Sequence, residues 1–136
     1  MKTIWCFALL VLVFLAAGIC EAEVPNLLGI WTGSWSGYDE GIGYSNSTEN
    51  ESIIITVTEQ ESRVFAGNIT IKQQNKTDIE DFAGAIGLDN KTLQIAEFGK
   101  GYALGTIVSN DEMELIYLSD GENGSVAIDS LRRMTV

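Results

Sequence analysis

Hydrophobic and polar residues alternate with a period of two in short runs along most of the chain, and polar segments separate the runs. This alternation is typical of β-strands that bury one face. No long run has the 3.6-residue period of an amphipathic helix. The pattern predicts eight strands, at 29–38, 52–59, 64–72, 81–87, 92–98, 101–108, 112–118 and 125–133.

The links between these runs are mostly short and rich in Asn, Asp and Gly, as expected for tight turns. Short antiparallel strands joined in sequence favour an all-β, eight-stranded antiparallel up-and-down β-barrel, because closure removes unpaired strand edges. A sandwich is the alternative, but short links leave little room for the long return of a Greek key.

The first run has an unusual composition, GIWTGSWSGY. Trp31, Gly33, Trp35 and Gly37 share one face, while small polar residues occupy the other. Large residues alternating with glycines on an inward face allow a small barrel to curve and to fill its taper. Trp31 and Trp35 are therefore predicted to point inward.

Counting in steps of two predicts the inward face of the other strands, most of which is expected to be core. The predicted inward residues are Ile53, Ile55, Val57, Phe65, Gly67, Ile69, Ile71, Phe82, Gly84, Ile86, Leu93, Ile95, Glu97, Tyr102, Leu104, Thr106, Met113, Leu115, Tyr117, Val126 and Ile128.

Gly29, Ile30 and Trp31 at the start of the first strand resemble the Gly-X-Trp signature of the calycins, the lipocalin and avidin-type barrels. The resemblance implies that an arginine of the last strand packs over Trp31 at a closed end. Arg132 is in phase with Val126 and Ile128 and is the first choice, with Arg133 as the competing one. The short links look more like the avidin type, but its biotin-contacting residues are not found.

Residues 1–22 have the layout of a secretory signal peptide: a basic start, an apolar run from Ile4 to Ile19 and a small-residue exit. Cleavage after Ala22 would leave a single β-barrel domain at 23–136, of a size suited to one core. The expected location is extracellular. The alternatives are a membrane anchor formed by an uncleaved signal or by lipidation of Cys20.

Six of the eight asparagines after residue 22 begin an Asn-X-Ser/Thr triplet, where chance predicts about one. These are Asn46, Asn50, Asn68, Asn75, Asn90 and Asn123. The triplets predict an extracellular glycoprotein. A Ser/Thr-rich β protein with Asn in its turns would produce the same enrichment without sugar.

Several kinds of chemistry are excluded by composition. The chain has no histidine, and its two cysteines, Cys6 and Cys20, both fall in the predicted signal. Imidazole and thiolate catalysis, disulfides and the usual zinc sites are therefore excluded, and neither a metal nor a cofactor is expected. A net charge of −11 argues against nucleic acid as a partner.

The calycin resemblance also implies an open mouth at the end opposite Trp31, surrounded by the links 39–51, 73–80, 99–100 and 119–124. Four residues are candidate ligand-binding residues because they fall in the inward phase toward this mouth: Trp35, Glu97, Tyr102 and Tyr117. Aromatic walls with a few polar groups are typical of small-molecule pockets. Glu97 stands out, since an inward carboxylate must be paired or have its pKa raised. The alternative is that the strand frays there and Glu97 reaches water.

Three functions remain open. The first is a secreted binding module for a small apolar or aromatic ligand, which is not an enzyme. The second is an extracellular protein-interaction barrel, an inhibitor or surface-layer component, with a filled interior and a binding loop at 39–51. The third is an enzyme with Glu97 as base and Tyr102 or Tyr117 as donor, but the sequence gives no matched second carboxylate.

Overall fold

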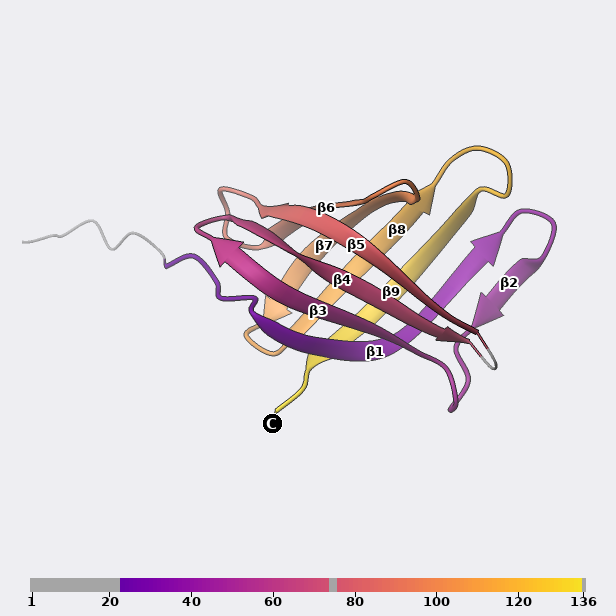
Figure 1. Cartoon of the computed structure of the whole chain (residues 1–136), viewed down its shortest axis with the longest axis horizontal. Helices are drawn as coiled ribbons and strands as arrows, with labels where there is room; N and C mark the ends of the chain where they lie inside the picture. Colours follow the sequence, from indigo (N-terminus) through magenta and orange to yellow (C-terminus); the bar gives the residue numbers. More distant parts are fainter. Residues whose placement is uncertain (1–22, 74–75, 136) are drawn as a thin grey trace, which may run out of the picture.

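The structure, a computed structural model, describes residues 23–73 and 76–135, which form strands, turns and loops (Figure 1). The predicted signal peptide, Cys20 and Asn75 lie outside the described residues. Among those that are described, no helix is long and apolar enough to cross a membrane. The strands are β1 (Gly29–Asp39), β2 (Gly43–Asn46), β3 (Ser52–Glu61), β4 (Val64–Gln73), β5 (Lys76–Ile86), β6 (Thr92–Glu97), β7 (Gly101–Ser109), β8 (Glu112–Ser119) and β9 (Ser125–Arg133).

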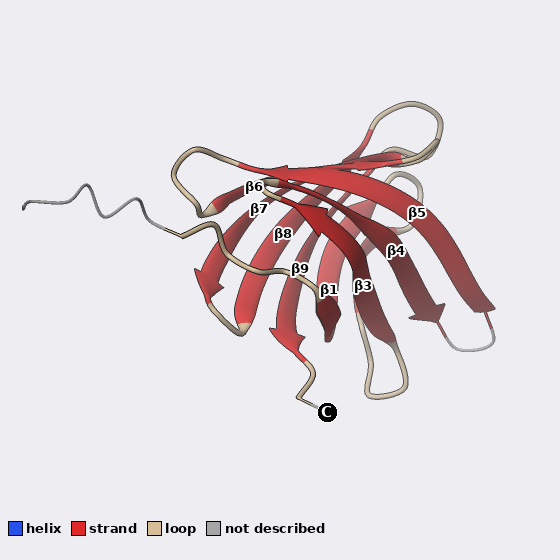
Figure 2. Ribbon diagram, turned by 60° about the vertical axis from the view of Figure 1, so that its left-hand side comes forward, coloured by secondary structure: helices blue, strands red, loops and turns tan. Residues whose placement is uncertain are grey.

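The strands form a closed antiparallel barrel. From β3 to β9 each strand pairs with its successor in the chain, and β1 pairs with both β3 and β9. The sheet curves round until its ends meet, which Figure 2 shows from the side. The eight-stranded up-and-down barrel predicted from the sequence is confirmed, and β1 and β3–β9 are its eight strands.

The short strand β2 was not predicted, because its four residues are polar and mostly small. It pairs with the end of β1 from Ser36 to Asp39, whereas β3 pairs with the start of β1 from Gly29 to Gly33. The Ser47 hydroxyl accepts a hydrogen bond from the Trp35 N–H at 3.1 Å, and the Ser47 N–H donates to the Trp35 carbonyl at 2.9 Å. Ser47 thus ties the segment after β2 to the middle of β1.

The half of the barrel nearest the start of β1 is filled by apolar side chains. Trp31 and Leu93 are completely buried, and the rings of Phe65 and Phe82 meet edge to face with their centroids 5.9 Å apart. Leu27, just before β1, is buried with them. This half is a packed core, which removes apolar surface from water and stabilises the barrel.

Gly33 of β1 lies directly opposite Leu131 of β9. A Cβ atom there would overlap the carbonyl oxygen of Ser130 and would lie 3.1 Å from the Leu131 Cα, and both are backbone atoms that cannot move aside. We expect Gly33→Ala to lower the free energy of unfolding by about 2 kcal/mol, measured by urea denaturation. Ser34→Ala, at the exposed neighbouring position, should change it by less than about 0.5 kcal/mol; equal effects would contradict this view of the barrel seam.

The predicted inward face of β7 was wrong. Gly101, Ala103, Gly105 and Ile107 point inward, while Tyr102 is 67% exposed and Leu104 is 50% exposed. The interior opposite β7 is already occupied by larger side chains: a Cβ on Gly101 would press on the Tyr117 ring and one on Gly105 on the Leu115 side chain. Small residues are therefore required inside, and the large ones of β7, together with Thr106, face outward.

The predicted phase of β9 was also wrong by one residue. Asp129 and Leu131 are buried, whereas Val126 and Ile128 are 40% and 45% exposed. Val126 lies beside Leu118, which in turn lies beside Tyr102, so the outer face of β7–β9 carries a row of apolar side chains. Because both faces of these strands are apolar, alternation alone does not identify the inner one.

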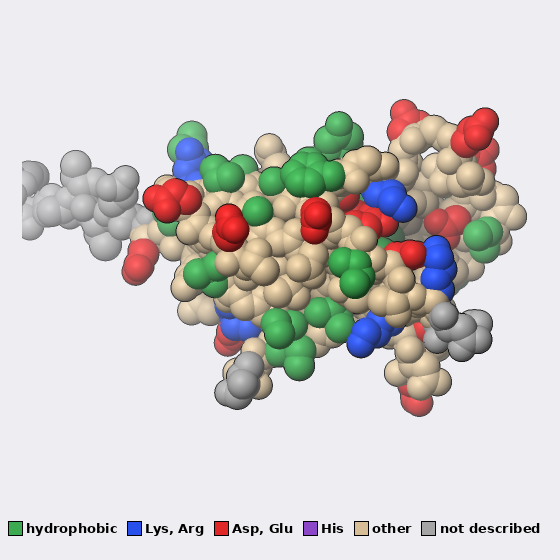
Figure 3. Space-filling model, viewed as in Figure 1, with side chains coloured by type: hydrophobic (Ala, Val, Ile, Leu, Met, Phe, Trp, Pro, Cys, Tyr) green, Lys and Arg blue, Asp and Glu red, His purple; other side chains and the backbone are tan. Residues whose placement is uncertain are grey.

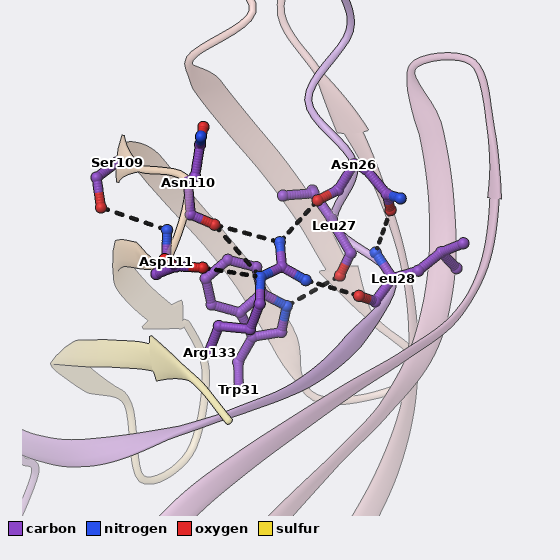
Figure 4. A network of polar contacts seen from close by, with 8 residues as sticks. All are labelled: Asn26, Leu27, Leu28, Trp31, Ser109, Asn110, Asp111 and Arg133. Carbon is purple, nitrogen blue, oxygen red and sulfur yellow. Dashed lines mark hydrogen bonds and ion pairs between the residues drawn. The ribbon is translucent and has the colours of Figure 1, made fainter. Parts of the chain in front are cut away.

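The arginine over Trp31 is Arg133, not Arg132. Its guanidinium carbon lies 4.1 Å from the centre of the Trp31 ring, and its Nη atoms donate to the carbonyls of Leu28 and Asn26, each at 2.7 Å (Figure 4). The Trp31 Nε1–H donates to the Leu27 carbonyl at 2.9 Å. Arg132 points outward and pairs with Glu112 at 2.9 Å, since the phase of β9 differs from the predicted one. Arg133 and Trp31 close this end of the barrel.

Candidate functional site

The other half of the barrel contains a cavity of about 400 Å³. Its walls come from the inward faces of seven strands, with isoleucines of β3 and β4 opposite aromatic, acidic and small residues. The lining residues within the barrel are Trp35, Gly37, Ile53, Ile69, Ile71, Glu80, Glu97, Tyr117, Ala127 and Asp129. A cavity of this size lies within the usual range for small-molecule sites.

The cavity opens among the connections predicted to surround the mouth. The residues that line it there are Asp39 at the end of β1, Ile42 in the β1–β2 turn, Gln73 at the end of β4, Lys100 in the β6–β7 turn and Ser125 at the start of β9. The predicted closed and open ends therefore correspond to the filled and hollow halves of the barrel.

Glu97 is the last residue of β6 and lies inside the cavity. It is 7% exposed and is paired in register with Phe82 and Gly101, so the strand does not fray there. Burial raises the pKa of Glu97 to about 7, and the negative charges of Glu80 and Asp129 add to the effect while Lys100 opposes it. The alternative in which Glu97 reaches water is wrong.

Asp129, on β9, is a second buried carboxylate in the same cavity. It is 5% exposed, and burial raises its pKa to about 7. Asp129 was not predicted from the sequence, because Val126 and Ile128 were assigned to the inner face of β9. Counting in steps of two back from Arg133, the competing arginine, would have placed Leu131 and Asp129 inward.

Glu80 and Lys100 form an ion pair at the edge of the cavity, with the Lys100 Nζ 3.0 Å from Glu80 Oε1. Glu80 keeps only 12% of its side-chain surface exposed. It was missed because β5 begins at Lys76 rather than at 81; extending the inward phase back from Phe82 identifies it. Lys100 lies in a turn, for which the period-two pattern gives no orientation.

Of the three aromatic candidates, two line the cavity and one does not. Trp35 is half-buried, and its indole Nε1 is buried without a hydrogen-bond partner among the described residues. Tyr117 is half-buried, and burial raises the pKa of its hydroxyl. Tyr102 is on the outer surface because β7 has the opposite phase. The structure thus brings together Trp35, Glu97 and Tyr117 and excludes Tyr102.

The cavity is strongly acidic. Four carboxylates line it, from Asp39, Glu80, Glu97 and Asp129, against one cationic side chain, that of Lys100. Acidic side chains elsewhere are scattered over the face shown in Figure 3 rather than gathered in one patch. The acidic groups that a ligand would meet together are therefore those inside the mouth, where the low dielectric strengthens their interaction with a charged ligand.

The triplet asparagines fall in different places around the barrel. Asn46, Asn50 and Asn123 are exposed, on β2 and in the β2–β3 and β8–β9 connections, on the mouth side. Asn68 is on β4, between Ile69 and the glycine that faces inward, and Asn90 is in the β5–β6 turn with a positive φ of 55°. Sugars at these positions would project from the outside of the barrel.

Comparison with known proteins adds no relative: no protein-family model matches the chain, and no curated protein is similar to it at a significant level. The site is therefore interpreted from its own geometry.

Proposed function

We propose that this protein is a secreted binding module that holds a small apolar or aromatic ligand in the mouth of the barrel. The observation that carries the proposal is the cavity of about 400 Å³, half apolar wall and half converging polar groups. Trp35 supports it further, because a buried indole N–H without a partner has lost its hydrogen bond to water. A bound ligand with an acceptor atom would restore that bond.

The family we propose is calycin-like. Two features support the resemblance of Gly29-Ile30-Trp31 to the calycin signature: the closed eight-stranded barrel and the stacking of Arg133 on Trp31. Both lie at the closed end, opposite the cavity. Fold alone does not specify a ligand, so the function rests on the cavity and its lining.

The proposal includes secretion and glycosylation, carried by the signal-like residues 1–22 and the six triplets. The exposure of Asn46, Asn50 and Asn123 is compatible with modification of a folded barrel. Glycans at these positions would surround the mouth and restrict entry to small ligands.

We expect the uncharged fluorescent probe N-phenyl-1-naphthylamine to bind the mature protein. Substitutions that fill the cavity with a larger side chain should weaken this binding. Ala127→Phe places a ring on the inner face of β9, and Ile71→Trp fills the opposite wall. Both substitutions should lower the affinity for the probe at least tenfold, since a filled cavity excludes its aromatic body. Fluorescence titration of each variant measures the effect.

The matched control is Ile128→Phe, next to Ala127 but on the outer face, 45% exposed. It should leave the affinity for the probe unchanged. Absence of probe binding to the parent protein, or equal loss in Ile128→Phe, would count against a ligand-binding mouth. Native mass spectrometry of protein from its own host, after deglycosylation, would then show whether any natural ligand is retained.

The alternative of a protein-interaction barrel assumes a filled interior. The cavity counts against that version, because only the closed half of the barrel is packed. An enzymatic alternative gains a second buried carboxylate in Asp129, but no substrate geometry supports it. Binding is therefore the function that we favour.

A further inference from the structure

The unusual feature of the mouth cavity is that it buries two carboxylates without supplying a partner for either. Glu97 is 7% exposed and Asp129 is 5% exposed, and both line the cavity. Among residues 23–73 and 76–135, no N–H or O–H donates a hydrogen bond to either carboxylate. A carboxylate held in a largely buried place without a partner from the protein is costly. The Trp35 Nε1 is the only fully buried side-chain nitrogen or oxygen of the described residues without a partner, so the oxygens of Glu97 and Asp129 face the open cavity, where a ligand can reach them.

The protein compensates these charges only in part, through the charge of Lys100, which lowers the pKa of Glu97. Lys100, the cation at the cavity, is bound to Glu80 at 3.0 Å and so already has its own carboxylate. Arg133 is engaged at the closed end by Trp31, Asp111 and three carbonyls. A ligand with a positive charge would therefore pair with Glu97 and Asp129 without competing with a cation of the protein.

The remaining lining indicates what kind of cation fits. Trp35, Tyr117 and the isoleucines of β3 and β4 give apolar and aromatic walls. Tryptophan is the most favourable ring for a cation, and such walls suit an organic body better than a hydrated metal ion. No group of three potential ligand side chains in the described part of the chain could hold a metal.

We propose that the cavity binds a small protonated amine with an apolar or aromatic body, whose ammonium group donates hydrogen bonds to Glu97 and Asp129. The inference rests on the proposed binding function and specifies its ligand class. The body of the ligand lies against Trp35 and the isoleucine wall. A hydroxyl or other acceptor on the ligand takes the hydrogen bond that the Trp35 indole N–H offers.

Three compounds of similar shape test the proposal: 2-phenylethylamine, 2-phenylethanol and phenylacetate. We expect the amine to displace N-phenyl-1-naphthylamine at a concentration at least tenfold lower than the alcohol, because a charged hydrogen bond adds roughly ten- to hundredfold in affinity. Phenylacetate should be the weakest, since the lining carries four carboxylates against one lysine.

Two variants identify the groups responsible. Glu97→Gln and Asp129→Asn should each lower the affinity for 2-phenylethylamine at least tenfold. The affinity for the uncharged probe should stay unchanged. Glu114→Gln is the control: it makes the same change of net charge on the exposed outer face of β8 and should leave the amine affinity unchanged. Because both variants replace a buried charge by a neutral group of similar shape, they are expected to fold.

The affinity for the amine should also fall as the pH is lowered from 8 to 5. Glu97 and Asp129 must be ionised, and Glu80, Lys100 and Tyr117 face them from β5, the β6–β7 turn and β8. The expected loss is about tenfold per pH unit below pH 7 for each carboxylate that must ionise. The affinity for 2-phenylethanol should change little over the same range.

The outcomes separate the two proposals. If the probe binds but the alcohol competes as well as the amine, the amine inference is overturned while the binding function stands. If neither the probe nor any of the three compounds binds, the binding function itself fails. A site specific for a metal ion, detected as Ca²⁺ displacing the probe where the amine does not, would also overturn the inference.

Discussion

Arg133→Ala is expected to lower the free energy of unfolding by about 3 kcal/mol. The substitution removes the cation from the face of Trp31 and leaves the carbonyls of Leu28 and Asn26 without their donors. The Arg133 side chain is only 22% exposed, so water replaces these contacts poorly. Urea denaturation followed by tryptophan fluorescence measures the loss.

The neighbouring arginine provides the control. Arg132 has 80% of its side chain exposed, and its contact with Glu112 is a surface ion pair. Arg132→Ala should therefore cost no more than about 0.5 kcal/mol. Arg133→Lys keeps the charge but not the planar fork that reaches two carbonyls, and it should recover less than half of the loss. Equal effects at 132 and 133 would contradict the role given to the closed end.

The strands and the closed topology could be predicted from the sequence because they depend on short-range signals. The eight strands of the barrel and their order follow from period-two runs, Asn/Asp/Gly turns and short links. β2 could not be found in this way, because its four polar residues form a strand only by pairing with the end of β1. The start of β5 was missed because its charged residues resemble a loop.

The inner face can be predicted from one strand where one face is clearly more apolar than the other. This holds for β3, β4 and β6, where Ile53, Ile55, Phe65, Ile69, Leu93 and Ile95 point inward as predicted. In β7 the space left by neighbouring side chains decides which face points inward. Its glycines lie inside against Tyr117 and Leu115, and its larger residues Tyr102 and Leu104 lie outside. Packing between strands distant in sequence is not visible in one strand's pattern.

The candidate site could be predicted in part for the same reason. Trp35, Glu97 and Tyr117 were found because their strands had the correct phase, and Asp129 and Glu80 were missed because theirs did not or began too late. Asp129 also violates the rule that charged residues face water. Such violations are expected at functional sites, where local preferences give way to binding.

The two carboxylates of the cavity are expected to make the ligand-free protein less stable at pH 8 than at pH 5. The pKa values of Glu97 and Asp129 are raised to about 7 in the folded state, from ordinary values of 4.5 and 3.8. The folded protein therefore holds more protons than the unfolded chain between about pH 4 and pH 7. The free energy of unfolding falls as the pH rises through this window and levels off above about pH 8.

The double variant Glu97→Gln/Asp129→Asn should remove this loss and raise the free energy of unfolding at pH 8 by about 3 kcal/mol, with little change at pH 5. Denaturation at both pH values measures it, and Glu114→Gln is again the control for net charge. Asp89, whose pKa is lowered to about 2, acts in the opposite direction but only below about pH 4. A double variant no more stable than the parent at pH 8 would contradict the buried-charge account.

Adding 2-phenylethylamine at pH 8 connects this stability to binding. A ligand that binds only the folded state raises the free energy of unfolding in proportion to the logarithm of its concentration over its Kd. The amine should therefore stabilise the parent at pH 8 and leave the double variant unchanged, although the variant is the more stable of the two without ligand. A binding site that keeps two carboxylates at a cost in stability, and regains that stability with a cation, would show that these residues serve the ligand rather than the fold.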